Sequence, residues 1–221
     1  MTGIYDTYPY ERVQNYNRLD GLEQVPKILC DYLLDLPSND YQPRTTNDYP
    51  RVRLMKYLYY DNARPLDQVA LTTEQKLSLV YDPYHPTEPP TGKGYRIFPN
   101  AYVTQTQLTG QTILRCYLGR IVPRDVFTAE VGIVFEILTQ MSYENNSKSE
   151  ALSRLTAMEQ CLWECCNGVN FAGVGTMYMD RREHGDCGSW GFTDEEQNVG
   201  RRIVFGMTFK AANAPNDISI G

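Results

Sequence analysis

The sequence lacks the features that mark several common classes of protein. It has no surplus of basic residues, because 21 Lys and Arg stand against 27 Asp and Glu and give a net charge of −6. A protein that grips nucleic-acid phosphates is usually basic, so stable non-specific binding to DNA is not expected. No apolar run reaches the about 18 residues of a transmembrane helix, so we expect no membrane partner. The first residues also lack the basic and apolar stretches of a signal peptide.

Motifs for metals and cofactors are also missing. The six cysteines include no C-x-x-C pair and lie mostly in apolar patterns, which is typical of reduced, buried thiols. Cys161 and Cys165 together with His184 and Cys187 are a weak zinc candidate. Gly173-Val174-Gly175 lacks the third glycine and the following helix of a nucleotide-binding motif. We therefore expect no metal and no cofactor, and the strongest catalytic hypothesis is a Cys187 nucleophile with His184 as its base.

The segment from Asp180 to Gly200 is a polar loop rich in Asp, Glu, Arg and Gly. Its acidic residues match no calcium-binding spacing, and the arginines among them favour a solvated hairpin. We predict that this loop projects from one end of the sheet and meets a partner. Its interface candidates are Arg181, Arg182, Glu183, Asp186, Trp190, Asp194 and Glu195.

Tyrosine is abundant, with 17 in the chain and ten of them before residue 61. A tyrosine ring offers a large apolar contact area with a polar tip, which suits protein interfaces. The alternative is an ordinary tyrosine-rich surface. Base stacking by the basic and aromatic segment 51–60 is a further alternative, which the acidic composition disfavours. The interface candidates are Tyr5, Tyr8, Tyr10 and Tyr16 in an extended arm at 1–18, and Tyr57, Tyr59 and Tyr60 in segment 51–60.

Two helices and several strands follow from the apolar spacing. The central helix is predicted at 147–167, with a Ser147–Glu150 capping box at its start and Gly168 just past its end. An earlier helix is predicted at 19–36, beginning or kinking near Val25–Pro26. Thr72 is the expected N-cap of a short helix.

Strands are predicted at 113–118, 131–138, 173–179 and 202–210, the second of them apolar on both faces and therefore central. The expected fold class is α+β, a mainly antiparallel sheet of about four strands packed by two helices. One domain is predicted over 19–211, with a large insertion at about 37–100, preceded by the arm at 1–18 and followed by a loose tail at 212–221.

The order helix, long insertion, β-hairpin, helix, β-hairpin resembles that of the tail terminator and neck proteins of long-tailed bacteriophages. The resemblance covers Leu22–Leu36 and Gln111–Ala211, and it rests on the strand Val131–Ile137, the helix Ser147–Cys166 and the strand Arg202–Phe209. It implies a structural virion protein without enzymatic activity, assembled in the host cytoplasm into a ring that is usually six-fold. Such a ring sits in the virion neck, caps the tail tube and joins it to the head connector, while double-stranded DNA passes through the lumen.

The resemblance leaves several alternatives open. Segment 37–100 exceeds a minimal member of the family, so another neck ring is an alternative to the terminator. Under this reading the arm and the insertion contact neighbouring copies, and loop 180–200 meets a partner ring or lines the lumen. A negative net charge suits a channel in which DNA must slide without sticking. An intracellular α+β enzyme that uses Cys187 and His184, or a monomeric adaptor, remains the competing hypothesis.

Overall fold

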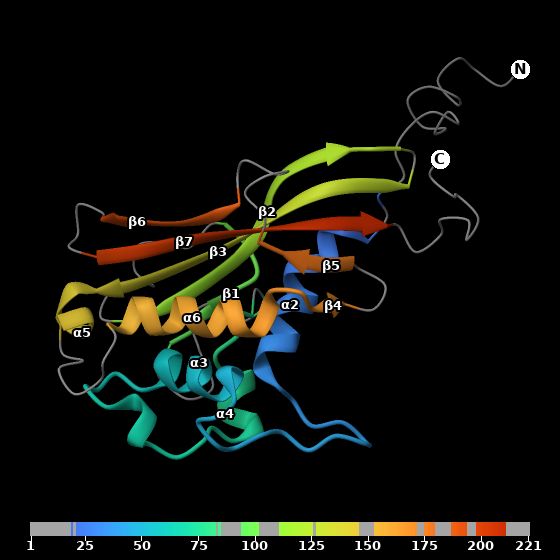
Figure 1. Cartoon of the computed structure of the whole chain (residues 1–221). Coiled ribbons are helices and arrows are strands. Elements are labelled where there is room, and N and C mark those ends of the chain that lie inside the picture. The colour runs from blue at the N-terminus through green and yellow to red at the C-terminus, as the bar shows by residue number, and fades with distance from the viewer. Residues whose placement is uncertain are drawn as a thin grey trace, which may run out of the picture.

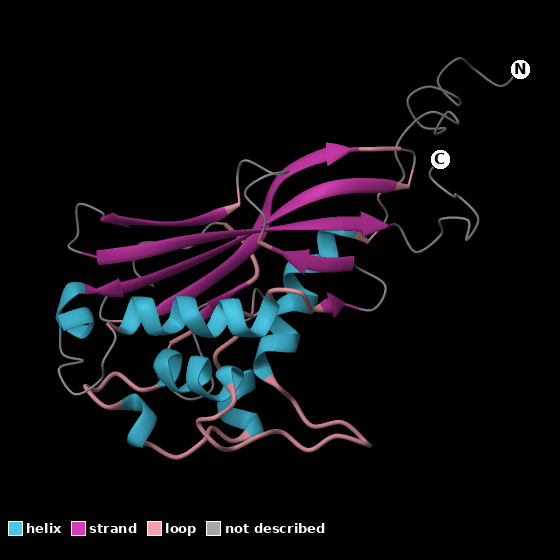
Figure 2. Ribbon diagram, in the orientation of Figure 1, coloured by secondary structure: helices cyan, strands magenta, loops and turns pink. Residues whose placement is uncertain are grey.

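A computed structural model describes residues 19, 21–82, 84, 94–101, 111–125, 127–145, 153–171, 175–179, 187–193 and 198–210. Within them a seven-stranded sheet runs in the order β1-β2-β3-β7-β5-β4, and β6 also pairs with β7 (Figures 1 and 2). Strand β1 is parallel to β2, and every other pair is antiparallel. The strands are β1 (Ile97–Phe98), β2 (Ile113–Pro123), β3 (Thr128–Gln140), β4 (Asn170–Phe171), β5 (Gly175–Tyr178), β6 (Gly188–Thr193) and β7 (Asn198–Lys210).

Strands β3 and β7 form the centre of this sheet. They pair along their full length, from Thr128 opposite Lys210 to Gln140 opposite Asn198. Side chains alternate between the two faces of a strand, so Ile133 and Phe135 of β3 lie on one face with Phe205 of β7. These residues are fully buried against the helices. The even-numbered residues of both strands therefore lie on the opposite face, which we call the helix-free face because none of the described helices packs on it (Figure 1).

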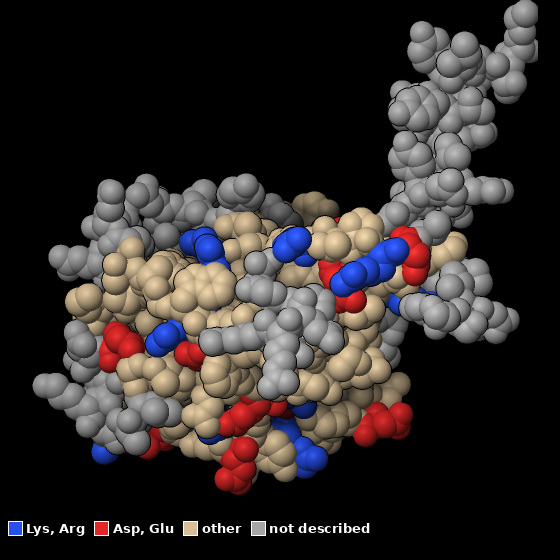
Figure 3. Space-filling model, turned by 45° about the horizontal axis from the view of Figure 1, so that its top comes forward, with Lys and Arg blue, Asp and Glu red and all other residues tan. Residues whose placement is uncertain are grey.

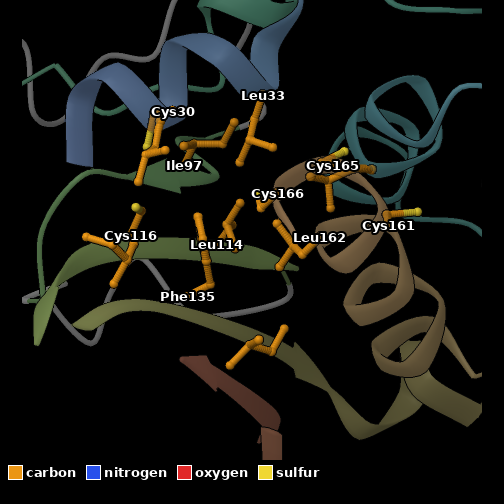
Figure 4. Packing of buried hydrophobic residues seen from close by; sticks show 14 of the residues in the cluster. Cys30, Leu33, Ile97, Leu114, Cys116, Phe135, Cys161, Leu162, Cys165 and Cys166 are labelled. Carbon is orange, nitrogen blue, oxygen red and sulfur yellow. The ribbon is translucent and has the colours of Figure 1, made fainter. Parts of the chain in front are cut away.

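The helices pack on the other face, and the sheet curls around them as a half-barrel. Helix α2 lies within the curl (Figure 1). Its Tyr32 ring meets Phe171 of β4 edge-on at 4.9 Å, and Figure 4 shows Ile97 of β1 beside its Cys30 and Leu33. The helical segments are η1 (Leu22–Gln24), α2 (Val25–Leu34), α3 (Pro50–Tyr59), η2 (Pro65–Asp67), α4 (Thr73–Leu77), α5 (Met141–Asn145) and α6 (Arg154–Cys166).

The prediction of about four antiparallel strands packed by two helices is wrong. Residues 37–100 contribute α3, β1 and the leucines Leu71 and Leu79 on either side of α4 to the same core as the rest of the chain. The basic residues of α3 hid its buried character, because Lys56 is buried and donates hydrogen bonds to Asn47 Oδ1 at 2.8 Å and Leu66 O at 3.2 Å. Strand β6 lies inside the segment predicted to be a polar loop, and β1 and β4 are each two residues long.

Two buried arginines, Arg96 and Arg154, connect these parts. Arg96 makes a two-pronged ion pair with Asp61, with N–O distances of 2.9 and 2.7 Å. Arg154, at the start of α6, donates to the carbonyl oxygens of Tyr57, Tyr60 and Asn62. Arg154 therefore holds the end of α3, whose last carbonyl groups have no partner within the helix.

Several predicted boundaries are confirmed, and one differs. Helix α2 begins at Val25–Pro26, and Thr72 forms a reciprocal capping box with Gln75. Gly168 takes φ of +76°, as expected just past the end of a helix. Helix α6 begins at Arg154 with Ser153 as its N-cap. The capping box predicted at 147–150 lies outside the described residues, as do the arm at 1–18 and the tail at 212–221.

All six cysteines are buried free thiols, as the apolar pattern indicated. Figure 4 shows five of them, Cys30, Cys116, Cys161, Cys165 and Cys166, in the core between the sheet and the helices. Burial raises the pKa of Cys161 and of Cys165 to about 12. Thiols with such high pKa values are poor nucleophiles. Among the described helices, none combines the length and the apolar character needed to cross a membrane.

Candidate interaction surface

One row of side chains crosses the helix-free face through four neighbouring strands. Trp190 of β6 lies opposite Arg202 of β7, Arg202 lies opposite Glu136 of β3, and Glu136 lies opposite Arg115 of β2. The register therefore alternates cation, anion and cation across β7, β3 and β2. Directly opposed charges of unlike sign stabilise a strand pair.

Glu136 is the centre of this row. The residue is only 3% exposed. The Arg202 Nε donates to its Oε1 at 2.6 Å, and the Arg115 Nη1 lies 3.3 Å from its Oε2. A carboxylate this deeply buried needs such partners, because desolvation disfavours an isolated charge. Burial, reinforced by a hydrogen bond to Glu136, raises the pKa of Tyr117 to about 12.

Arg202 connects this buried cluster to aromatic rings nearer the surface. Its guanidinium carbon lies 6.0 Å from the ring centroids of both Trp190 and Phe192. Trp190 is 42% exposed. The ion pair with Glu136 fixes Arg202, and Arg202 in turn restricts the two rings. The result is an aromatic pair on β6 that is held in place and partly open to solvent.

Aromatic rings also lie directly on glycines of β7. A Cβ atom added at Gly200 would overlap the Phe192 ring, and one at Gly206 would lie 2.6 Å from the Tyr178 ring. Glycine is required at both positions because the rings occupy the space of a side chain. The Tyr178 hydroxyl donates to Glu130 Oε2 at 2.8 Å. Figure 3 turns the helix-free face towards the viewer. The described residues in this view are mostly uncharged, with scattered lysine, arginine, aspartate and glutamate side chains among them.

Strand β6 forms an edge of this surface. It pairs with β7 on one side, and the described residues place no strand on its other side. In an antiparallel pair every second residue points its N–H and C=O away from the partner. Gly191 is exposed, and since glycine has no side chain, the exposed atoms belong to the backbone. The strand Gly-Ser-Trp-Gly-Phe-Thr contains no charged residue and no proline.

The structure places the predicted interface residues in three groups. Trp190 lies on the surface just described. Tyr57 and Tyr59 belong to α3 and are buried in the core, and Tyr60 is partly exposed. The others lie outside the described residues, so their interface role stays a prediction: Tyr5, Tyr8, Tyr10, Tyr16, Arg181, Arg182, Glu183, Asp186, Asp194 and Glu195.

Of the residues considered for chemistry, the structure describes only the thiols. Cys187 is buried at the start of β6, and His184 lies outside the described residues. Among the described residues no group of three or more His, Cys, Asp or Glu side chains could hold a metal ion.

Sequence reasoning missed Glu136, Arg202 and Arg115. The available signal was a charged residue within strands that are otherwise apolar on both faces. Their mutual register could not be read from a single sequence, because Glu136 and Arg202 are 66 positions apart.

The fold and surface define a mixed α+β protein with one helix-covered and one helix-free sheet face. Residues 52–206 match the model of the YomW family, which covers more than half of the chain. The chain therefore belongs to the YomW family, a phage-derived family of the SPBeta-like kind. No curated protein matches the chain. The phage origin of the family agrees with the phage resemblance of the sequence.

Proposed function

We propose that this protein is a structural component of a phage particle. In this proposal its copies assemble into a closed ring in the virion neck, which caps the tail tube and joins it to the head connector. DNA passes through the lumen of the ring without specific binding. Membership of a phage-derived family supports the phage assignment, and the neck position rests on the resemblance of the element order.

The observation that carries the assembly part is strand β6. It offers an uncharged edge with exposed backbone at Gly191 and a partly exposed Trp190. Soluble proteins usually blunt such an edge with charged residues, proline or a covering segment. An edge without these devices is suited to pairing with another chain. A ring requires one patch on each subunit that fits a different patch on the next, and β6 is one such patch.

The acidic composition fits the lumen role. At a net charge of −6, a ring of several copies repels DNA phosphates at long range. An enzyme that uses Cys187 is less well supported, because that thiol is buried.

Native mass spectrometry and negative-stain electron microscopy of the purified full chain test the proposal. Closed rings, with six copies as the expected number, support it. A phage lacking this gene should accumulate filled heads and separate tails. Compact monomers at all concentrations, or normal joined particles from the deletion phage, would overturn it.

A further inference from the structure

We infer that β6 accepts the tyrosine-rich segment 1–18 of a neighbouring copy as an added strand. The inference rests on the proposed function in one respect, since it presumes copies that assemble with one another. It deepens that function by naming both partners of the contact. The occupant is a segment of this same chain, and the acceptor is the edge Gly188–Thr193.

The acceptor offers both backbone and side-chain recognition. Along an antiparallel strand, alternate residues point their N–H and C=O groups towards and away from the partner strand. Three of the six residues of β6 therefore point these groups away from β7, whether the odd or the even positions do so. Added strands gain affinity from such main-chain hydrogen bonds and specificity from alternate side chains. On the helix-free face the alternate side chains are Trp190 and Phe192, both next to Arg202. An incoming strand therefore meets two aromatic rings two residues apart.

The arm carries the matching pattern. Tyr8 and Tyr10 are also two residues apart, so both fall on one face of an extended strand. If the backbone N–H groups of Tyr8 and Tyr10 face β6, the backbone nitrogen of Pro9 faces away from β6. Proline has no N–H, and none is needed on that outer side because no further strand pairs there. Pro9 then also blocks the new outer edge against a further strand. The segment thus fits the role of a final strand rather than an inner one.

The position of the arm favours a neighbour over the same subunit. Residue Leu19, next to the arm, packs against the core. Helix α2 begins near the C-terminal end of β7, whereas β6 pairs with the other end, at Val199–Val204 (Figure 1). The start of α2, which follows the arm in the chain, and the acceptor strand therefore lie at opposite ends of the sheet, an arrangement that suits a head-to-tail contact. Fully extended, the 18 residues reach about 60 Å, which is long enough to extend beyond the subunit to a neighbouring copy.

Two registers follow from the shared spacing. In antiparallel docking, with Tyr8 opposite Phe192 and Tyr10 opposite Trp190, Thr7 lies opposite Thr193. In parallel docking, with Tyr8 opposite Trp190, Glu11 lies opposite Thr193. Opposed residues of paired strands are close enough for a disulfide bond. The exposed Thr193 is therefore a suitable cross-linking position.

A cross-linking experiment with the full chain tests the inference. The native thiols are buried, so they leave a quiet background. Thr193→Cys protein is mixed either with Thr7→Cys protein or with Glu11→Cys protein. Oxidised glutathione then drives disulfide formation in each mixture. Each chain carries one introduced cysteine, so a bond between the two variants must join different copies. Cross-linking at one of the two arm positions is expected, and the control Val69→Cys, at a residue 77% exposed, should give no link to Thr193→Cys.

Tryptophan fluorescence supplies an independent readout. The chain has two tryptophans, Trp163 on α6 and Trp190 on β6, each 42% exposed. In Trp163→Phe protein, assembly should shift Trp190 emission to shorter wavelength, and Tyr8→Ala with Tyr10→Ala should abolish the shift. In Trp190→Phe protein the remaining Trp163 should not respond.

The possible results separate the two proposals. Rings that form without any Thr193 cross-link or Trp190 shift would overturn the inference and leave the proposed function standing. A Trp190 shift that persists without the two tyrosines, together with a cross-link between two Thr193→Cys copies, would assign the edge to β6 of a second copy instead. Monomers at every concentration would overturn the proposed function and the inference together.

Discussion

At the scale of single residues, Glu136 forms ion pairs with both Arg115 and Arg202. Glu136→Gln keeps the shape but leaves two cations facing each other without a counter-charge. We expect a loss of about 3 kcal/mol in the free energy of unfolding, typical of breaking a buried pair. Urea titration measures it. The control is Asp31→Asn, which breaks the exposed Lys27–Asp31 pair and should cost under about 0.5 kcal/mol. Equal losses in the two variants would refute the role of Glu136.

Tyr117 gives the same cluster a dependence on pH. Its pKa is raised to about 12 in the folded protein, against about 10 in an unfolded chain. Between these values the unfolded chain ionises first, so the stabilisation from this phenol is complete below about pH 10 and is lost as the pH rises towards 12. Tyr117→Phe should be less stable than the native protein at neutral pH. The gap should narrow as urea titrations move into this alkaline window, and a constant gap would contradict the prediction.

At the scale of elements, the start of α6 is set by Ser153. Its Oγ accepts from the Thr156 N–H, and Glu144 of α5 accepts from the Leu155 N–H at 2.9 Å. Ser153→Ala should cost about 1 kcal/mol of stability and Ser153→Gly only a few tenths. Thermal melts of both variants check this. Ser147→Ala, at the cap position that the sequence pattern predicted, is the comparison, and a larger loss there than at Ser153 would count against the observed boundary.

Arg154 joins α6 to the end of α3, because it is buried and donates hydrogen bonds to the carbonyl oxygens of Tyr57, Tyr60 and Asn62. Arg154→Met removes these charged hydrogen bonds and leaves several carbonyl groups unsatisfied. We expect a loss of about 3 kcal/mol or more. Arg53→Met is the matched variant, because Arg53 forms a partly exposed ion pair with Glu164 and should cost at most about 1 kcal/mol. A reversed order in chemical denaturation would contradict this assignment.

Helix boundaries that are set by a single nearby residue could be predicted from the sequence. Pro26, Thr72 and Gly168 act on the backbone within a few residues of themselves, so each marked a real boundary. Strand β6 has no such signal, because Trp190 and Phe192 alternate with glycine and serine and the strand exists only through pairing with β7. Two-residue strands such as β1 and β4 are likewise products of the surrounding fold.

At the scale of the whole molecule, segment 37–100 shows why the predicted architecture failed. An insertion is predicted there because segment 51–60 indicates no clear element type and residues 82–90 are rich in proline. In the structure Lys56, Lys76 and Arg96 are buried, and each has a carbonyl or carboxylate partner well away in the sequence, as Arg96 has in Asp61. Such long-range compensation cannot be read from local composition. The helix-free face was missed for the same reason, since its cluster depends on the register of three strands.

The described core begins at Leu19 and continues to Lys210. Removing residues 1–18 should therefore leave a cooperative melting transition at an unchanged temperature in differential scanning calorimetry, while sedimentation shows weakened assembly. The full chain at a concentration where it is monomeric is the control. Loss of the cooperative transition would show that the arm belongs to the folding unit rather than to the contact between copies.

The uncharged edge of β6 also sets a condition on the supply of the protein. A bare edge is a template for any extended chain, including incompletely folded copies. Productive pairing and aggregation then compete for the same surface, and both speed up with concentration. Solubility therefore depends on timing: assembly that keeps pace with synthesis leaves few uncovered edges at any moment, whereas a stockpile of unassembled subunits is the state most prone to precipitate.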